Sequence, residues 1–225
     1  MRRAEDAVNL IKRNFFKSML FSEIERTVQS FDFNEISNDR KAILQPLIEY
    51  IQNKVNNQEQ VNLNFICTHN SRRSHLSQIW AQAGAAYYKI KPVYCYSGGT
   101  EETAMYPMIA ETLRASGFKI TVLSKGVNPV YSIKYASNRH PLIGFSKLYD
   151  ADFNPQDDFA AIMTCSKADG DCPFISGAEK RIPIAFDDPK KSDITPHQKE
   201  IYRKSSHEIG TEMFYVFSQI NNYDL

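Results

Sequence analysis

The sequence predicts an α/β fold in which a four-stranded parallel sheet is covered by helices on both faces. From residue 61 onward, short apolar runs typical of buried strands alternate with longer segments of helical periodicity. This alternation favours parallel strands joined by helices. The first 60 residues lack it and contain no glycine and a single proline. We therefore expect an N-terminal helical extension over residues 1–60 and a main α/β domain over residues 61–225.

In the N-terminal extension, apolar residues recur at the spacing of one helix face. The clearest stripe comprises Leu44, Leu47, Ile48, Ile51 and Val55. Pro46 lies inside this pattern, so the helix either starts near it or kinks there. A second helix is predicted around residues 21–31. Because the stripe must be covered, we expect the longer helix to pack on the main domain or on a second subunit of a homodimer. A partner-recruiting module is the alternative.

The main domain is predicted to contain four buried strands, at residues 61–66, 93–97, 159–164 and 182–186. The first predicted helix begins after the turn that follows the first strand and ends at residue 89. Two more helices are predicted over residues 102–116 and 195–221. Gly117 stands directly after the second of these helices, where a left-handed residue commonly ends a helix. Residues 120–158 are less regular, and we interpret them as an inserted hairpin or a long loop.

The composition excludes several classes of protein. With 27 basic and 26 acidic residues the formal charge is +1, so no overall field concentrates nucleic acid or an anionic membrane. The apolar stretch at residues 15–21 is too short to span a bilayer, and the basic start lacks the pattern of a secretory signal. Four cysteines without an export signal are expected to be reduced. These features predict a soluble cytoplasmic protein without a nucleic-acid or membrane partner.

The most informative segment lies between the first strand and the following helix and begins with Cys67. A loop at this place directs backbone N–H groups and a helix N-terminus into one concavity, which suits a tetrahedral oxyanion. The same donors favour the thiolate form of Cys67. Arg73 can fork onto two oxyanion oxygens, Ser74 can hydrogen-bond the thiolate, and Asn70 can brace the loop. The predicted oxyanion-binding residues are Thr68, His69, Asn70, Ser71, Arg72, Arg73 and Ser74.

This Cys-x5-Arg-Ser segment at a strand-to-helix turn resembles the signature loop of the low-molecular-weight protein tyrosine phosphatase superfamily. That superfamily also contains the thioredoxin-coupled arsenate reductases. Residues 97–100, Ser-Gly-Gly-Thr, resemble the family's Ser-Ala-Gly-Thr, and Asp188–Pro189 resembles its general-acid loop. The resemblance covers residues 61–225 and implies a flavodoxin-like sheet, with Cys67 as nucleophile and Arg73 as anion clamp. The alternative is a buried cysteine and a surface arginine on an unrelated α/β domain.

Asp188 is the predicted general acid. Breaking a bond to oxygen leaves a poor leaving group unless a proton is supplied in the transition state. A carboxylic acid opposite the nucleophile supplies that proton. Asp187 is adjacent, but the family's acid directly precedes the proline, so the resemblance selects Asp188. Both aspartates as solvated turn residues are the alternative.

Two further cysteines bear on the reaction. Cys165 and Cys172 follow the third strand with six residues between them, which resembles the redox pair of the arsenate reductases. A thiol near Cys67 can attack a Cys67–arsenic adduct, and a second thiol can then relieve the first disulfide. The resemblance thus implies reduction of arsenate to arsenite, with thioredoxin as electron donor and no cofactor. A phosphatase that hydrolyses phosphomonoesters needs only Cys67, and two ordinary cysteines are the remaining alternative.

Some residues depart from the family pattern. Lys190 follows Asp-Pro where the phosphatases usually carry an aromatic residue, which disfavours a phosphotyrosine site. His69 and Arg72 stand where the reductases usually have Gly and Cys, and a more basic loop would alter anion selectivity. Cys95 is predicted to belong to the core. The five histidines show no metal-ligand spacing, so no metal is expected.

Overall fold

The structure is a computed structural model, and it describes residues 20–171 and 174–221. The first elements along the chain are α2 (Ser22–Val28), η1 (Phe33–Glu35), α3 (Asn38–Asn56), β1 (Val61–Cys67), α4 (Arg73–Tyr87), β2 (Val93–Gly99) and α5 (Pro107–Ala115). They are followed by β3 (Lys119–Ser124), β4 (Val130–Lys134), β5 (Leu142–Gly144), β6 (Phe159–Met163), α6 (Ser166–Asp171), β7 (Ala178–Pro183), η2 (Pro189–Ser192) and α7 (Gln198–Ser218).

The main sheet has four parallel strands in the order β2-β1-β6-β7. The register pairs Cys67 with Gly99 and Ile66 with Met163, so three strands end at the same edge of the sheet. Ligands of open α/β sheets bind at this carboxyl edge. The predicted α/β class with a four-stranded parallel sheet is confirmed.

The fourth strand begins earlier than the sequence predicted. β7 occupies Ala178–Pro183 rather than residues 182–186, and most of its side chains are partly exposed, as expected of an edge strand. Its alternation was hard to recognise because Ile182 is its only residue that is both apolar and buried. The ladder nevertheless continues past β7, since the N–H groups of Ile184 and Phe186 donate to Met163 and Thr164. The predicted segment therefore extends the strand toward the carboxyl edge.

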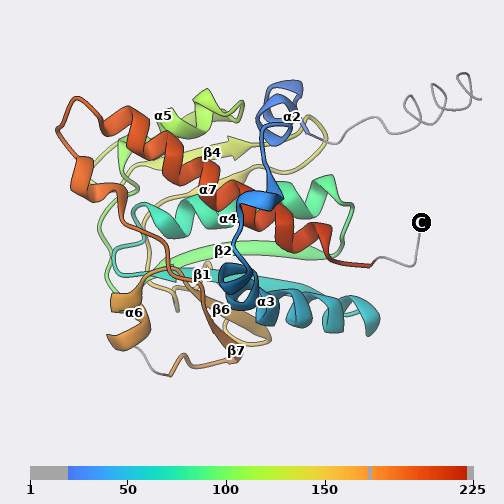
Figure 1. The fold of residues 1–225 in the computed structure, drawn as a ribbon. Helices are drawn as coiled ribbons and strands as arrows, with labels where there is room; N and C mark the ends of the chain where they lie inside the picture. Colours follow the sequence, from blue (N-terminus) through green and yellow to red (C-terminus); the bar gives the residue numbers. More distant parts are fainter. Residues whose placement is uncertain (1–19, 172–173, 222–225) are drawn as a thin grey trace, which may run out of the picture.

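Two apolar clusters lie on opposite faces of the sheet. On β6, Ala160 and Ile162 belong to the larger cluster, whereas Phe159, Ala161 and Met163 belong to the smaller one. The larger cluster is formed with side chains of α3, α4 and α7, and Figure 1 shows α4 and α7 running side by side. The smaller cluster includes Cys67, Cys165 and Ala168, and the last of these belongs to α6. Helices therefore cover both faces, but unequally.

The N-terminal helices pack on this chain. α3 begins at Asn38, where the Ser37 hydroxyl accepts the N–H of Arg40 at 3.1 Å. Pro46 lies within the helix, so the alternative in which the helix starts near it is wrong. The predicted stripe is buried or partly buried in the larger cluster, and α3 contacts α7, β7 and β1. Of the two expected ways to cover the stripe, the structure shows packing on the main domain.

Residues 119–144 form a second sheet of three antiparallel strands in the order β3-β4-β5. The inserted hairpin is therefore present, with one strand more than a hairpin needs. α5 starts at Pro107 and not at residue 102, because proline is favoured in the first helical turn and residues 100–106 pair with the loop of β1. Gly117 has the left-handed φ of +100° that was predicted, and a side chain there would meet the backbone of α2.

Candidate active site

The segment after β1 is a tight loop whose carbonyl groups are anchored on its outer side. The carbonyls of Cys67 and Thr68 accept the N–H groups of Thr100 and Glu101, at 3.1 and 2.8 Å. That of His69 accepts the hydroxyl of Ser146 at 2.9 Å. In a planar trans peptide the N–H points opposite to the carbonyl. The N–H groups of the following residues therefore face the other side of the loop, as an oxyanion cradle requires.

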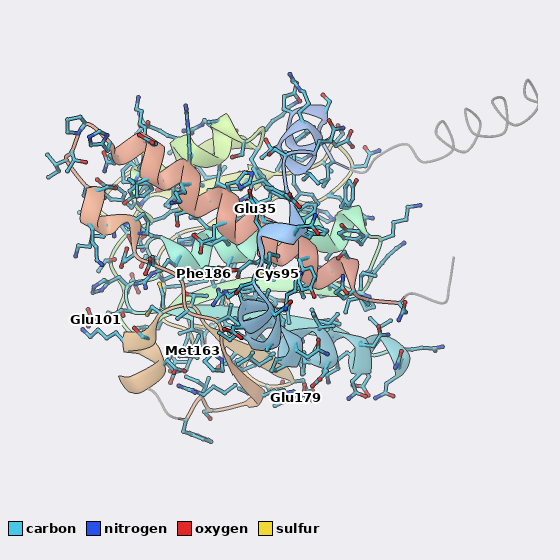
Figure 2. All side chains as sticks on the ribbon, viewed as in Figure 1. Glu35, Cys95, Glu101, Met163, Glu179 and Phe186 are labelled. Carbon is cyan, nitrogen blue, oxygen red and sulfur yellow. The ribbon has the colours of Figure 1, made fainter. Side chains whose placement is uncertain are left out.

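Gly99 allows β2 to approach this loop closely. A Cβ at this position would lie 2.8 Å from both the nitrogen of Asn70 and the carbonyl oxygen of Thr68, and 2.4 Å from the carbonyl of Glu101. Any side chain would therefore push the loop away from the end of β2. Figure 2 shows Glu101 at the left end of the molecule, the end at which α6 lies in Figure 1.

Cys67 is buried, and its sulfur lies 3.1 Å from the Ser74 hydroxyl. The Asn70 amide donates to the same hydroxyl at 2.9 Å, and its oxygen accepts the N–H of Lys147 at 3.0 Å. Because the Ser74 oxygen is already an acceptor, its own hydrogen is available to donate to the sulfur. A donor aimed at sulfur stabilises a thiolate. The structure thus places Ser74 beside Cys67, and Asn70 between Ser74 and Lys147.

Arg73 is the first residue of α4 and reaches the predicted acid. One guanidinium nitrogen donates to Asp188 Oδ2 at 2.7 Å, and another donates to the carbonyl oxygen of Phe186 at 3.1 Å. Asp188 Oδ1 accepts the N–H of Lys190 and so caps η2. Asp187 is exposed. Arg73 and Asp188, the anion clamp and the acid predicted from sequence, are therefore in contact. In this arrangement Asp188 accepts from a guanidinium nitrogen that an oxyanion would use.

The two additional basic residues of the loop each have an acidic neighbour. His69 Nδ1 lies 3.0 Å from a Glu101 carboxylate oxygen. The Arg72 guanidinium donates to Asp193 at 2.5 Å and to the hydroxyl of Tyr202 at 2.6 Å. The side chain of Arg72 thus points toward α7 and takes no part in forming a more basic anion cradle. Its place among the oxyanion-binding residues depends on its backbone N–H.

Cys165 lies directly beside the loop. Its sulfur is 3.5 Å from the Thr68 hydroxyl and accepts the N–H of Ala168 at 3.3 Å. Cys165 and Cys67 belong to the same small apolar cluster. Cys172, the predicted second member of the redox pair, lies outside the described residues. Cys95 belongs to the larger cluster, as predicted for a core residue, and burial raises the pKa of its thiol.

Two buried bases stand behind the loop. His75 is fully buried, and its pKa is lowered to about 3, first by burial and then by the charge of Lys147. Its Nδ1 lies 3.3 Å from the Ser97 hydroxyl. Burial also lowers the pKa of Lys147 to about 8. The Lys147 ammonium lies over the rings of Phe145 and Phe153, 4.5 and 5.2 Å from their centroids, where the negative ring faces partly replace water.

A separate cavity of about 400 Å³ opens at the other end of β2. Its lining includes Val93, the first residue of that strand, together with Lys91 and His140. β2 has seven residues from Val93 to Gly99, so the two ends lie about 20 Å apart at the usual rise per residue. This cavity is therefore not the site that holds Cys67.

Sequence reasoning did not identify Asp193, Tyr202 or Lys147 as parts of the site. Asp193 and Tyr202 are 121 and 130 residues from Arg72 along the chain. No local pattern marks them, because any acidic residue or tyrosine on the last helix and its approach would satisfy the same spacing. The only available signal was the extra arginine of the loop, which needs a counter-charge when it is partly buried.

Several solved structures are similar to this chain at low sequence identity. A YwlE mutant from Bacillus subtilis is 11% identical with a TM-score of 0.46, covering 71% of this chain and 97% of the other. An arsenate reductase in a phosphate-binding state is 16% identical, with a TM-score of 0.45 and coverage of 72% and 99%. A low-molecular-weight phosphotyrosine phosphatase from Vibrio cholerae O395 is 13% identical, with a TM-score of 0.45 and coverage of 70% and 94%.

No family model matches the sequence. No curated protein matches it either.

Within residues 20–171 and 174–221, no helix combines the length and apolar character needed to span a membrane. Across the same part of the chain, no three His, Cys, Asp or Glu side chains gather as metal ligands would.

Proposed function

We propose that this protein is an arsenate reductase of the thioredoxin-coupled type. The observation that carries the proposal is the place of Cys165, a buried thiol beside the loop that holds Cys67. A hydrolytic enzyme has no need of a second thiol there. A reductase needs one, because electrons must reach the arsenic through sulfur.

The loop and Arg73 would bind arsenate, with the backbone N–H groups and the guanidinium shared among its oxygens. Arg73 must then exchange Asp188 for the oxyanion. The Cys67 thiolate attacks arsenic, a sulfur–arsenic bond forms, and one arsenic–oxygen bond breaks. Asp188 protonates the departing hydroxide, so that water leaves.

Cys165 completes the reduction. Its thiolate attacks the sulfur of Cys67, a disulfide forms, and the electron pair of the sulfur–arsenic bond remains on arsenic. Arsenic(V) is thereby reduced to arsenic(III) and leaves as arsenite. Cys172 then attacks the Cys165 sulfur, which releases the Cys67 thiolate, and the dithiol of thioredoxin reduces the resulting Cys165–Cys172 disulfide. These thiols must be reduced at rest, which fits the cytoplasm.

The sheet register supports the first disulfide. β1 and β6 are neighbours, and the N–H of Thr164 donates to the carbonyl of Ile66 at 2.7 Å. Cys67, the last residue of β1, follows Ile66, and Cys165, two residues after the end of β6, follows Thr164. Neighbouring strands lie about 4.8 Å apart, and disulfides join Cα atoms that are about 4.4–6.8 Å apart. The two cysteines are therefore placed on chain segments close enough to be joined by a modest movement.

A phosphomonoester hydrolase is the second candidate function. Cys67, Ser74, Arg73 and Asp188 form a complete set for a cysteinyl-phosphate that water hydrolyses. The contact between Arg73 and Asp188 supports this activity as well as it supports arsenate chemistry. Both activities are therefore measured in the same experiment.

The test compares arsenate-dependent NADPH oxidation, with thioredoxin and thioredoxin reductase present, against hydrolysis of p-nitrophenyl phosphate. We expect Cys165→Ser to abolish arsenate turnover and to retain hydrolysis of the aryl phosphate. Cys95→Ala is the matched control, since it also removes a buried thiol, but from the other face of the sheet. Undiminished arsenate reduction by Cys165→Ser would show that the relay is wrong.

A further inference from the structure

The loop carries two consecutive arginines, and the structure gives them different partners on one segment. Arg73 contacts Asp188, at the N-cap of the short helix η2. Arg72 contacts Asp193, directly after the end of the same helix. The segment that bears the predicted acid is therefore held at both ends by neighbouring residues of the anion-binding loop.

The contacts of Arg72 form a closed polar cluster. Its Nε donates to the Tyr202 hydroxyl at 2.6 Å, and that hydroxyl donates to Asp193 Oδ1 at 2.5 Å. Its guanidinium lies 4.1 Å from the ring centroid of Tyr106. Gln198 donates to both the Tyr106 hydroxyl and Asp193, at 2.8 and 3.2 Å.

The cluster is largely withdrawn from water. The side chains of Arg72 and Asp193 are 11% and 17% exposed. A charge-assisted pair at this burial is stronger and better defined than a surface pair. Burial and the bond to Asp193 also raise the pKa of Tyr202, which therefore stays protonated and able to donate.

The helix η2 transmits this fixed position to Asp188. The N–H of Asp193 donates to the carbonyl of Lys190 at 2.9 Å, and the Ser192 hydroxyl donates to that of Pro189 at 2.7 Å. Pro189 and Ser192 are buried. Because only one hydrogen-bonded turn separates the two aspartates, the position of Asp193 largely determines where Asp188 lies.

The two arginines differ in whether their side-chain contacts must break when an oxyanion binds. Arg73 has to release Asp188 in order to fork onto the anion, so this contact is lost when the acid is needed. Arg72 faces away from the cradle, and none of its side-chain contacts has to break. Without a second attachment, the acid segment would be free to move when the anion arrives.

We infer that Arg72 is a positioning residue that keeps Asp188 over the loop after an oxyanion has displaced it from Arg73. This inference rests on the proposed function, because it assumes that Asp188 acts as the acid in chemistry at Cys67. It assigns the unusual arginine of the loop to placement of the acid and not to anion selectivity.

The kinetic test uses Arg72→Gln with two aryl phosphates whose leaving groups differ in their need for a proton. Phenyl phosphate releases phenoxide, a poor leaving group, and we expect its kcat/KM to fall by about 10²-fold, a typical contribution of general acid catalysis. For p-nitrophenyl phosphate the loss should be about tenfold smaller. Asp193→Asn should show the same selectivity, and inhibition by inorganic phosphate should be nearly unchanged because Arg73 is intact.

Arg40→Gln is the matched control. Arg40 also forks onto a partly buried carboxylate of α7, that of Glu212, at 2.7 and 2.8 Å. It should lower stability without changing the ratio of the two kcat/KM values. Equal losses on both substrates for Arg72→Gln, or no loss, would overturn the inference.

A second measurement does not depend on turnover. With saturating inorganic phosphate, hydrogen exchange of residues 187–195 should remain slow in the wild type and in Arg40→Gln, and become fast in Arg72→Gln. Unchanged exchange in Arg72→Gln would also overturn the inference. Failure of the proposed function is recognised separately, by a wild type that turns over neither arsenate nor aryl phosphate, or by an Asp188→Asn variant with wild-type leaving-group dependence.

Discussion

On one face of the parallel sheet, the helices α3, α4 and α7 bury a continuous apolar cluster; on the other face, a small cluster beside α6 contains Cys67 and Cys165. Each face holds at least one buried cysteine, but the surroundings differ. Cys95 is enclosed by apolar side chains, and burial raises its pKa. Cys67 and Cys165 lie where two strands end and hydroxyl groups come within reach. We therefore expect the polar neighbours at the strand ends, and not burial alone, to decide which cysteine reacts.

The largest expected effect is on the small face, where a substitution at Cys67 should abolish activity and leave stability almost unchanged. Cys67→Ser should lower both arsenate reduction and aryl phosphate hydrolysis by roughly 10³-fold or more, because the hydroxyl is a far weaker nucleophile than a thiolate. The free energy of unfolding should change by only about 1 kcal/mol, since the two side chains are similar in size. Steady-state kinetics and urea denaturation measure the two quantities. A variant that unfolds in the absence of urea would contradict this separation.

On the large face, a substitution should affect stability without affecting chemistry. Ile51 on α3 is fully buried, and Ile51→Ala should lower the free energy of unfolding by about 2–5 kcal/mol through lost apolar contact and a residual cavity. Ile43→Ala, on the same helix but 43% exposed, should change it by about 0.5 kcal/mol or less. Kinetic constants measured well below the melting temperature should be unchanged in both. If Ile51→Ala is stable but inactive, α3 helps to build the site.

The difference between the faces also explains which features were predictable from sequence. Strands β1, β2 and β6 and the loop of Cys67 were recognisable because a buried central strand and its following turn form one local pattern. The stripe on α3 was equally clear, since period and burial agree along a single helix. By contrast, β7 has three consecutive charged residues directly before Ile182, and its strand character comes from its pairing with β6.

The contacts around the acid segment were not predictable for a related reason. Asp188 could be selected because Pro189 marks its position in the chain. Asp193 acquires its role only when α7 brings Tyr202 and the loop brings Arg72 to the same point. No spacing in the sequence encodes such a three-way contact, so the side chain of Arg72 could be assigned a direction only from the structure.

A smaller effect concerns the buried cation behind the loop. The pKa of Lys147 is lowered to about 8 by burial, whereas an unfolded lysine titrates near 10.4. Between these values the unfolded chain binds more protons than the folded one, so this residue makes the folded state more stable as the pH rises. Below pH 8 Lys147 is charged in both the folded and the unfolded state. Burying this charge then lowers the free energy of unfolding by about 3 kcal/mol, from the difference between the two pKa values.

Lys147→Met removes this titration. The variant should therefore exceed the wild type in unfolding free energy by the largest amount at pH 7, and the difference should shrink toward pH 10. Urea denaturation of both proteins at pH 7, 8.5 and 10 gives the comparison, in which other groups that titrate in this range cancel. A difference that is constant with pH would show that the ammonium is not desolvated in the folded state.

The smallest expected effect is on the cysteine of the large face. Cys95 is 3% exposed, pairs with Leu63 in the sheet and has a carbonyl that accepts the amide of Gln78 at 2.9 Å. Cys95→Ala removes one sulfur atom from an apolar site and should cost about 1 kcal/mol, with less than about a twofold change in either activity. In the folded wild type, iodoacetamide should modify Cys67 first and leave Cys95 until the protein unfolds, because the raised pKa of Cys95 keeps its thiol protonated. Saturating phosphate should slow the modification of Cys67 alone, and mass spectrometry of the peptides identifies the modified residue. Early modification of Cys95, or loss of arsenate reduction in Cys95→Ala, would mean that the large face takes part in the chemistry and that the contrast between the two faces is wrong.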